Sequence, residues 1–193
     1  MKFLILDIET NGIGTFRPPS QKPIQVSFQL VDTDGEIIID YSEFIKGVRA
    51  IQWGGSIGEC PWTVEYVNSV GVPISSCIAS IKDAIDDDTI IVGHNIEFDI
   101  STLMNARHSK TITLTKQICT MKRSVEFCKI PSKYKYSAYK WPKLIELANS
   151  LDIEVDDSKF HDSVYDVEIT KQCFFSLLRK GEITPEGYLA DSN

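Results

Sequence analysis

The chain has 193 residues, which is the size of one ordinary domain. With 42% hydrophobic and 24% charged residues, its composition is close to the globular average and excludes a disordered, collagen-like or coiled-coil protein. The formal net charge is −7, whereas proteins that coat nucleic acid are usually basic. Any contact with nucleic acid is therefore expected to be local or assisted by metal.

The sequence indicates neither secretion nor membrane insertion. Its five cysteines are odd in number, and none has the two-residue spacing of a zinc knuckle or a redox motif. The apolar run at residues 3–6 is far shorter than the ~7–15 residues of a signal-peptide core, and no stretch approaches the ~20 apolar residues of a membrane span. We expect an intracellular, cytoplasmic protein with no membrane partner.

Hydrophobic alternation predicts a meander of three strands at the start of the chain. Residues 1–9 are apolar on both faces until Asp7, which is typical of a buried, central strand. Residues 24–31 and 36–45 also have strand patterns, and the sequence from Asp32 to Gly35 between them is a hairpin signal.

Strands alternate with helices in the rest of the chain, which predicts an α/β fold with a mixed sheet. Residues 1–181 are expected to form one domain and 182–193 a C-terminal tail. The last helix is closed by Gly181. The predicted elements are helices over 64–68 and 75–85, a strand over 89–92, a helix from 96 to about 107, a strand over 117–120, and helices over 141–151 and 163–180.

Two acids share one face at the end of the first strand. Asp7 and Glu9 have Cα atoms about 6.6 Å apart in an extended strand. Two carboxylates that converge in a partly dry site repel each other, and each has a raised pKa unless a cation lies between them. The alternative is that the strand ends here and both acids point into water.

Two further acids fall on the inward faces of predicted helices. Asp99 is in line with Leu103, and Asp166 is in line with Ile169 and Cys173. Burying an unpaired charge costs several kcal/mol, whereas the dipole of a helix N-terminus contributes only ~0.3–1 kcal/mol. A shared divalent cation explains all four acids at once.

His161 lies five residues before Asp166, about 140° away on an ideal helix, so the two cannot share a helical face. We expect His161 on the loop that enters the helix, with Asp162 or Ser163 as the N-cap. A histidine beside carboxylates can act as a base, and the alternative is an ordinary surface histidine.

Three segments together resemble the motifs of the DEDDh, or DnaQ-like, family of 3′–5′ exonucleases in the ribonuclease H-like superfamily. They are Asp7-Ile8-Glu9-Thr10-Asn11-Gly12, His94-Asn95-Ile96-Glu97-Phe98-Asp99 and His161-Asp162-Ser163-Val164-Tyr165-Asp166. Their order and spacing match the family, and the resemblance spans residues 1 to about 180. Asn11, Ser163 and Val167 stand where threonine or alanine is frequent in the family, and no catalytic position is empty.

The resemblance implies a ribonuclease H-like fold, in which a three-stranded antiparallel meander is joined by parallel strands and flanked by helices. It also implies a site with Asp7, Glu9, Asp99 and Asp166 as metal ligands and His161 as general base. Two Mg²⁺ or Mn²⁺ ions ~3.5–4 Å apart can stabilise the attacking and leaving oxygens of a phosphoryl displacement. The expected product is a nucleoside 5′-monophosphate released from a 3′ end.

Four more residues are expected near the terminal nucleotide. The resemblance places Thr10, Ile13 and Phe98 against it, with Asn95 beside the site. For Ile13 and Phe98, the alternative is packing in the hydrophobic core.

Charge points to a separate contact with substrate. Residues 116–143 hold eight basic residues and one acid, within a protein whose net charge is −7. Lys133 and Lys135 alternate with Tyr134 and Tyr136, and lysines with aromatic rings are typical of single-strand binders. The alternative is a solvated basic face.

The expected function is therefore a metal-dependent 3′–5′ exonuclease acting on a nucleic acid with a free 3′ end, in single-stranded form. One alternative is a proofreading subunit of a DNA polymerase, and another is a non-catalytic module that binds nucleic acid. All five motif residues are present, which favours an enzyme, and no polymerase-binding extension follows Asn193, which favours a free-standing one. DNA and RNA both remain candidate substrates, since the choice depends on contacts to a 2′-hydroxyl. A homodimer partner also remains open.

Overall fold

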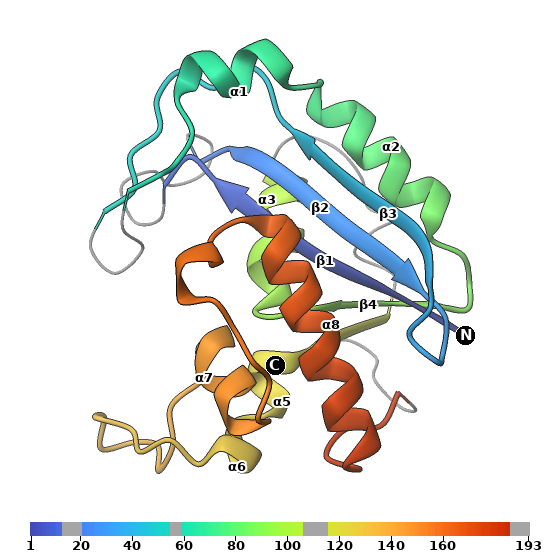
Figure 1. Cartoon of the computed structure of the whole chain (residues 1–193), viewed down its shortest axis with the longest axis vertical. Coiled ribbons are helices and arrows are strands. Elements are labelled where there is room, and N and C mark those ends of the chain that lie inside the picture. Colours follow the sequence, from blue (N-terminus) through green and yellow to red (C-terminus); the bar gives the residue numbers. More distant parts are fainter. Residues whose placement is uncertain (13–20, 55–58, 106–115, 186–193) are drawn as a thin grey trace.

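A five-stranded mixed sheet forms the centre of the molecule, as the computed structural model shows (Figure 1). The structure describes residues 1–12, 21–54, 59–105 and 116–185. The strand order is β3-β2-β1-β4-β5, so β1 is central as its sequence predicts. The strands are β1 (Lys2–Thr10), β2 (Pro23–Val31), β3 (Ile37–Phe44), β4 (Thr89–Gly93) and β5 (Lys116–Cys119).

The sheet combines an antiparallel meander with two parallel strands. β1 pairs antiparallel with β2, and β2 pairs antiparallel with β3. β4 lies parallel to β1, and β5 parallel to β4. Asp32 Oδ1 accepts hydrogen bonds from the backbone N–H groups of Asp34 and Glu36, both at 2.9 Å, and closes the hairpin between β2 and β3. The predicted three-stranded antiparallel meander joined by parallel strands is confirmed.

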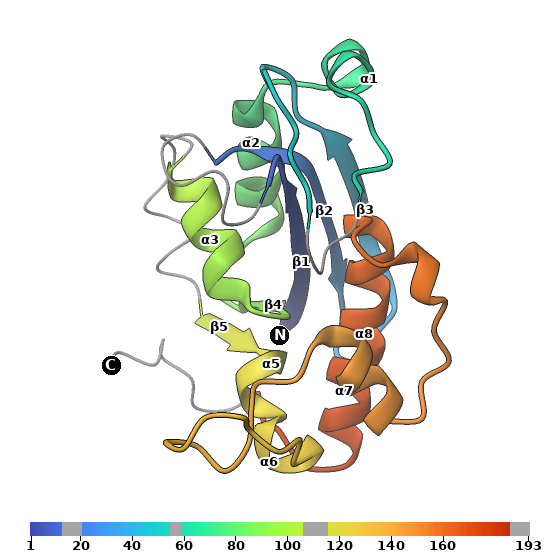
Figure 2. The same ribbon diagram turned by 90° about the vertical axis from the view of Figure 1, so that its left-hand side faces the viewer.

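Helices cover both faces of the sheet (Figure 2). α8 packs on one face with α7 beside it, and α2 and α3 pack on the other. The helices are α1 (Val64–Val70), α2 (Ile74–Ala84), α3 (Ile96–Asn105), α5 (Thr120–Arg123), α6 (Val125–Cys128), α7 (Leu144–Ser150) and α8 (Ser163–Arg179), with a 3₁₀ turn, η2 (Asp157–Lys159). None of the described helices is long and apolar enough to cross a membrane.

The alternation in β1 produces two separate cores. Phe3 and Ile5 point toward α8, where the Phe3 ring meets that of Phe174 edge-on with centroids 4.8 Å apart. Leu4 and Leu6 point to the opposite core, formed with α2 and α3. Each such side chain contributes about 1.5–3 kcal/mol when fully buried. The strand is therefore held between two layers, and the acids at its carboxyl end are held with it.

The predicted helices are present with shifted ends. The helix predicted over 141–151 begins only at Leu144, because Lys143 has an extended backbone (φ −70°, ψ 160°). α5 and α6 were not predicted, since helices of four residues are too short to show a 3.6-residue period. The helix after Asn95 is described to Asn105, and residues 106–115 lie outside the described part. The last helix ends as predicted, with Gly181 at φ +70°.

A glycine at the end of β4 brings three elements together. A Cβ atom on Gly93 would lie 3.0 Å from the carbonyl oxygen of Leu6 and 2.8 Å from Cδ1 of Ile96. Only glycine permits this close approach of β4 to β1 and to the start of α3. The second motif, which follows Gly93, is thereby placed next to the part of β1 where the first motif begins.

Candidate active site

Three side chains from distant parts of the chain converge beside the end of β1. Glu9 lies on β1, His161 on the loop before α8, and Asp166 in the first turn of α8. One ligand atom from each, a carboxylate oxygen or an imidazole nitrogen, lies within 4.8 Å of the others. Glu9 and Asp166 are buried, and His161 is half-buried. The described residues thus form a group that could hold a metal ion.

Asp7 and Asp99 complete the acidic cluster. Asp99 lies in the first turn of α3, and its Oδ1 accepts a hydrogen bond from the backbone N–H of Ile8 at 3.1 Å. Burial, and then the charge of Asp7, raise the pKa of both Asp99 and Asp166. Asp7 therefore acts on acids of two different helices, and the structure brings together all four acids singled out in the sequence.

The cluster resists carrying its full negative charge. Burial, and then the charges of Asp166 and Asp162, raise the pKa of Glu9 to about 8. Burial, and then the charge of Asp7, raise the pKa of Asp166 to about 8. Burial, and then the charge of Glu9, raise the pKa of Asp7 well above its usual range, and burial followed by the charge of Asp7 does the same for Asp99. A cation among these groups would remove the repulsion.

The donor set fits a hard divalent cation. Oδ2 of Asp166 accepts a hydrogen bond from the backbone N–H of His161 at 3.2 Å. Oδ1 of Asp166 is buried and has no hydrogen-bond partner in the described part of the chain. A buried carboxylate oxygen without a partner is costly. Mg²⁺ and Mn²⁺ prefer oxygen ligands, which several carboxylates supply here.

The loop before α8 holds His161 in a left-handed conformation, with φ +69°. Asp162 is the N-cap of α8, and its side chain accepts from the N–H of Val164, so the predicted loop position and N-cap are confirmed. Burial, and then the charge of Lys143, lower the pKa of His161. In this environment its imidazole is neutral near neutral pH and can accept a proton.

Trp53 is a neighbour of the site that sequence analysis missed. Its Nε1 donates a hydrogen bond to the carbonyl of Thr10 at 2.7 Å, and its ring centroid lies 6.1 Å from that of His161. The backbone N–H of Gln52 donates to the carbonyl of Asn11 at 2.8 Å, which fixes this segment against the end of β1. The only available signal was two tryptophans nine residues apart in a glycine-rich stretch.

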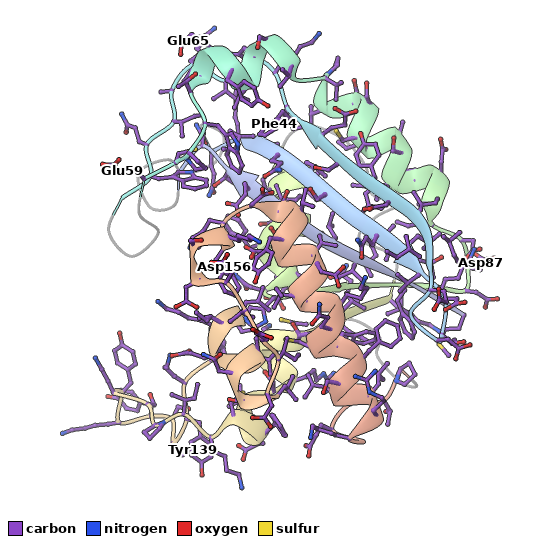
Figure 3. The ribbon with its side chains drawn as sticks, in the orientation of Figure 1. Phe44, Glu59, Glu65, Asp87, Tyr139 and Asp156 are labelled. Carbon is purple, nitrogen blue, oxygen red and sulfur yellow. The ribbon has the colours of Figure 1, made fainter. Side chains whose placement is uncertain are left out.

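A hollow of about 400 Å³ opens beside Trp53. Trp53 forms part of its wall, and the Trp53 ring centroid lies 6.1 Å from that of His161, so this wall borders the site. Glu59, which is labelled in Figure 3, is one of its lining residues. The residues that line the hollow are Ile51, Gln52, Trp53, Glu59, Cys60, Trp62, Thr63 and Val64. Two indole rings thus form a concave aromatic surface next to the site.

The other residues predicted to contact substrate differ in their burial and in their place in the fold. Thr10 is buried at the end of β1. Asn95 is half-buried with φ +75°, and its carbonyl accepts from the N–H of Phe98 at 2.8 Å. Phe98 is half-buried in the first turn of α3. Ile13 lies outside the described residues.

The basic segment is not one continuous surface. Lys122 pairs with Glu97, and Lys140 pairs with Glu146. Lys133 and Lys135 are exposed on the segment between α6 and α7, where Tyr136 is 101% exposed. This segment projects at the lower left of Figure 1, whereas the carboxyl end of β1 lies in the upper half of both views. The structure does not bring Lys133 and Lys135 to the acidic cluster.

The histidine of the second motif has a structural role. His94 Nδ1 lies 3.0 Å from Thr120 Oγ1, and His94 Nε2 lies 3.0 Å from the carbonyl oxygen of Pro142. Burial lowers the pKa of His94 to about 4. A neutral imidazole therefore connects the end of β4 to α5 and to the segment before α7.

Solved structures of 3′-exonucleases share this fold. A 3′-exonuclease whose structure concerns 3′-end-specific recognition of a histone mRNA stem-loop aligns with a TM-score of 0.70 and 15% identity, over 93% of this chain and 82% of its own. A full-length 3′-exonuclease aligns with a TM-score of 0.68 and 14% identity, over 100% and 92%.

Exonuclease I of E. coli, in complex with a dT13 oligonucleotide, aligns with a TM-score of 0.64 and 16% identity over 92% of this chain. The chain spans 41% of exonuclease I. No protein-family profile and no curated protein sequence matches the chain. At these low identities the comparisons establish the fold, which is that of exonucleases acting at 3′ ends.

Proposed function

We propose that the protein is a metal-dependent 3′–5′ exonuclease, with residues 1–181 as its catalytic domain, that releases nucleoside 5′-monophosphates. One observation carries the proposal: Glu9, His161 and Asp166 converge within 4.8 Å, backed by Asp7 and Asp99, in a fold shared with 3′-exonucleases. An acidic cluster with raised pKa values and a neighbouring histidine is typical of a catalytic site.

The acids would hold two Mg²⁺ or Mn²⁺ ions. Glu9 and Asp166 belong to the converging group, and Asp7 interacts electrostatically with both. Asp99 interacts electrostatically with Asp7 and Glu9, and its Oδ1 accepts from the N–H of Ile8 at the end of β1. When bound, such ions stabilise negative charge on the attacking and leaving oxygens. His161 would accept the proton of the attacking water, since burial favours its neutral form.

The aromatic hollow supports binding of the terminal nucleotide. Trp53 and Trp62 have ring centroids 6.0 Å apart and line the hollow, and Trp53 lies beside His161. Stacking of a base on an aromatic side chain is worth about 1–3 kcal/mol. We place the base there, with Thr10, Ile13, Asn95 and Phe98 as further contacts.

Cationic side chains would bind the phosphates. Lys143 is exposed and acts electrostatically on His161, so it is placed to meet a phosphate near the site. Lys133 and Lys135 project elsewhere and would contact only a strand long enough to reach them. Tyr134 and Tyr136 beside them offer exposed ring faces for stacking.

The direct test uses 5′-labelled single strands of DNA and RNA, each with a free 3′-hydroxyl or with a 3′ end blocked by an inverted nucleotide. We expect stepwise shortening of the free strand with Mg²⁺ or Mn²⁺, none with EDTA, and protection of the blocked strand. The Asp166→Asn variant is the matched control and should leave both strands intact. Binding without hydrolysis in either ion would contradict the proposal and indicate a non-catalytic module.

A further inference from the structure

A row of buried polar side chains on β2 lies beside the motif acids. The backbone register pairs Gln25 with Glu9 and Ser27 with Asp7. Gln25 is only 3% exposed and Ser27 only 2%. Side chains of directly paired residues project from the same face of a sheet. The two strand positions next to the catalytic acids are therefore occupied by buried, neutral hydrogen-bonding groups.

Both ends of the Gln25 amide bind the start of α8. Nε2 of Gln25 donates to Oδ1 of Asp162 at 3.0 Å, and Oε1 of Gln25 accepts from the backbone N–H of Ser163 at 3.2 Å. Ser27 Oγ lies 2.7 Å from Ser163 Oγ and donates to Ser42 Oγ at 2.8 Å. The bonds from Gln25 and Ser27 to Asp162 and Ser163 link residues 136–138 positions apart in the chain.

These contacts supply hydrogen-bond partners at the buried start of α8. The first N–H groups of a helix have no partner within the helix, and Ser163 is fully buried. Gln25 accepts from one of these N–H groups without adding charge, whereas a carboxylate there would add a further negative charge beside Glu9 and Asp162. The amide also holds Asp162, whose Oδ1 accepts from the N–H of Val164 as the N-cap.

Asp162 and Ser163, which Gln25 binds, lie in the chain between His161 and Asp166. His161 immediately precedes Asp162, and Asp166 lies three residues after Ser163, where its N–H donates to the carbonyl of Asp162 at 2.9 Å. A shift at the start of α8 therefore moves His161 and Asp166 together, relative to Glu9 on β1.

We propose that Gln25 is a positioning residue that sets the distance between the acids of β1 and the His161–Asp166 pair of α8, with Ser27 in support. Its consequence for catalysis rests on the proposed nuclease function. The effect of Gln25 on the position of α8 does not depend on that function. Hydrogen exchange of the metal-free protein therefore tests this effect independently.

The test compares Gln25→Leu with the matched control Gln29→Leu. Gln29 lies on the same face of β2 and is also buried, but it lies opposite Ile5 rather than a motif acid. Its Nε2 donates to Asp40, and its side chain interacts with Glu168 of α8, beyond the helix start that Gln25 binds. Three quantities are measured: amide hydrogen exchange at the start of α8 without metal, Mn²⁺ affinity by calorimetry, and kcat and KM on a labelled strand.

For Gln25→Leu we expect faster exchange at Ser163 and Val164, and a loss of about 10–100-fold in Mn²⁺ affinity and in kcat. KM should change little, because the substrate hollow is formed by other elements. The milder Ser27→Ala should show the same changes to a smaller degree and guards against misfolding of the first variant. Equal effects of Gln25→Leu and Gln29→Leu on exchange and Mn²⁺ affinity would overturn the proposal.

An exchange of donor and acceptor provides a rescue. Gln25→Glu alone places a carboxylate against that of Asp162 and should impair the same three quantities. The double variant Gln25→Glu/Asp162→Asn restores a donor opposite an acceptor at unchanged total charge, and asparagine is also a good N-cap. We expect it to recover most of the lost Mn²⁺ affinity and protection from exchange, and a double variant no better than Gln25→Glu would contradict the positioning role.

An absence of nuclease activity in the wild-type protein would contradict the proposed function but not the role of Gln25 in positioning α8. The exchange data would still decide whether Gln25 anchors α8.

Discussion

The carboxyl group of Asp166 shows how a single residue can indicate a binding site. It is buried, its Oδ1 has no partner among the described residues, and burial together with Asp7 raises its pKa to about 8. A side chain selected only for packing would not keep a carboxylate in this setting. The residue destabilises the metal-free fold, and a bound cation would reverse that effect.

Replacing this carboxyl should therefore separate stability from activity. Asp166→Asn keeps the shape of the side chain and removes a repelling charge, so its melting temperature in EDTA at pH 7.5 should equal or exceed that of the wild type. Added Mn²⁺ should stabilise the wild type and not the variant. Turnover above about a tenth of the wild-type value would contradict the assignment of Asp166 as a metal ligand.

His161 can be tested as base or ligand, since it lies close enough to Glu9 and Asp166 for either role. As a general base, its loss in His161→Ala should lower kcat by about 10²–10⁴-fold. We expect Mn²⁺ affinity, measured by calorimetry, to remain close to that of the wild type. A parallel loss of Mn²⁺ binding would identify His161 as a metal ligand instead.

The helices and strands that could be predicted from the sequence are those determined by residues close together in the chain. β1, β2 and α8 were predictable because alternation and helical periods are local, and the hairpin because Asp32 and Gly35 belong to the turn itself. The acids were predictable from the same patterns, because a carboxylate on an apolar face conflicts with its surroundings.

The missed features depend on distant partners. Gln25 reads as an ordinary strand residue, since its partner Asp162 is 137 positions away. Trp53 became part of the site through hydrogen bonds to the end of β1, within a stretch with no periodic pattern. The basic residues at 116–143 looked continuous, because local counting does not show that Lys122 and Lys140 are paired with acids.

The packing of β4, α5 and the segment before α7 should depend on pH through His94. Burial lowers the pKa of His94 to about 4 in the folded state, below the ~6.5 of an unperturbed histidine. The unfolded state therefore binds the proton first, and the contribution of His94 to stability, complete above pH 6.5, is lost as the pH falls toward 4.

We expect urea midpoints of the wild type to fall between pH 6.5 and pH 4 more steeply than those of His94→Gln. The comparison cancels the contributions of acids common to both proteins. Parallel curves would show that His94 is not held neutral in the fold.

In the molecule as a whole, an exposed cluster of positive charge lies away from the acidic site. The protein carries a net charge of −7 and an acidic site, yet an exposed segment between α6 and α7 carries Lys133 and Lys135 (Figure 1; Tyr139 marks this segment in Figure 3). A strand that extends from the site to this segment would gain affinity there, and a shorter one would not.

Neutralising Lys133 and Lys135 together should therefore affect only long substrates. Each phosphate contact contributes about 0.7 to the slope of log affinity against log salt for single strands, so the slope should flatten by about 1.4. Turnover of a saturating dinucleotide should be unchanged. The matched control, Lys46→Gln/Lys82→Gln, removes the same charge from two other exposed lysines and should leave the slope as it is. Equal losses on dinucleotide and long strand would show that the segment shapes the active site.

The most direct test of the acidic cluster is anomalous diffraction from crystals soaked with Mn²⁺ and a nucleoside 5′-monophosphate. We expect strong anomalous density between the carboxylates of Asp7, Glu9 and Asp166, with the phosphate of the nucleotide beside it and the base against Trp53. Absence of anomalous density among these carboxylates, at Mn²⁺ concentrations that support turnover, would contradict the assignment of this cluster as the catalytic metal site.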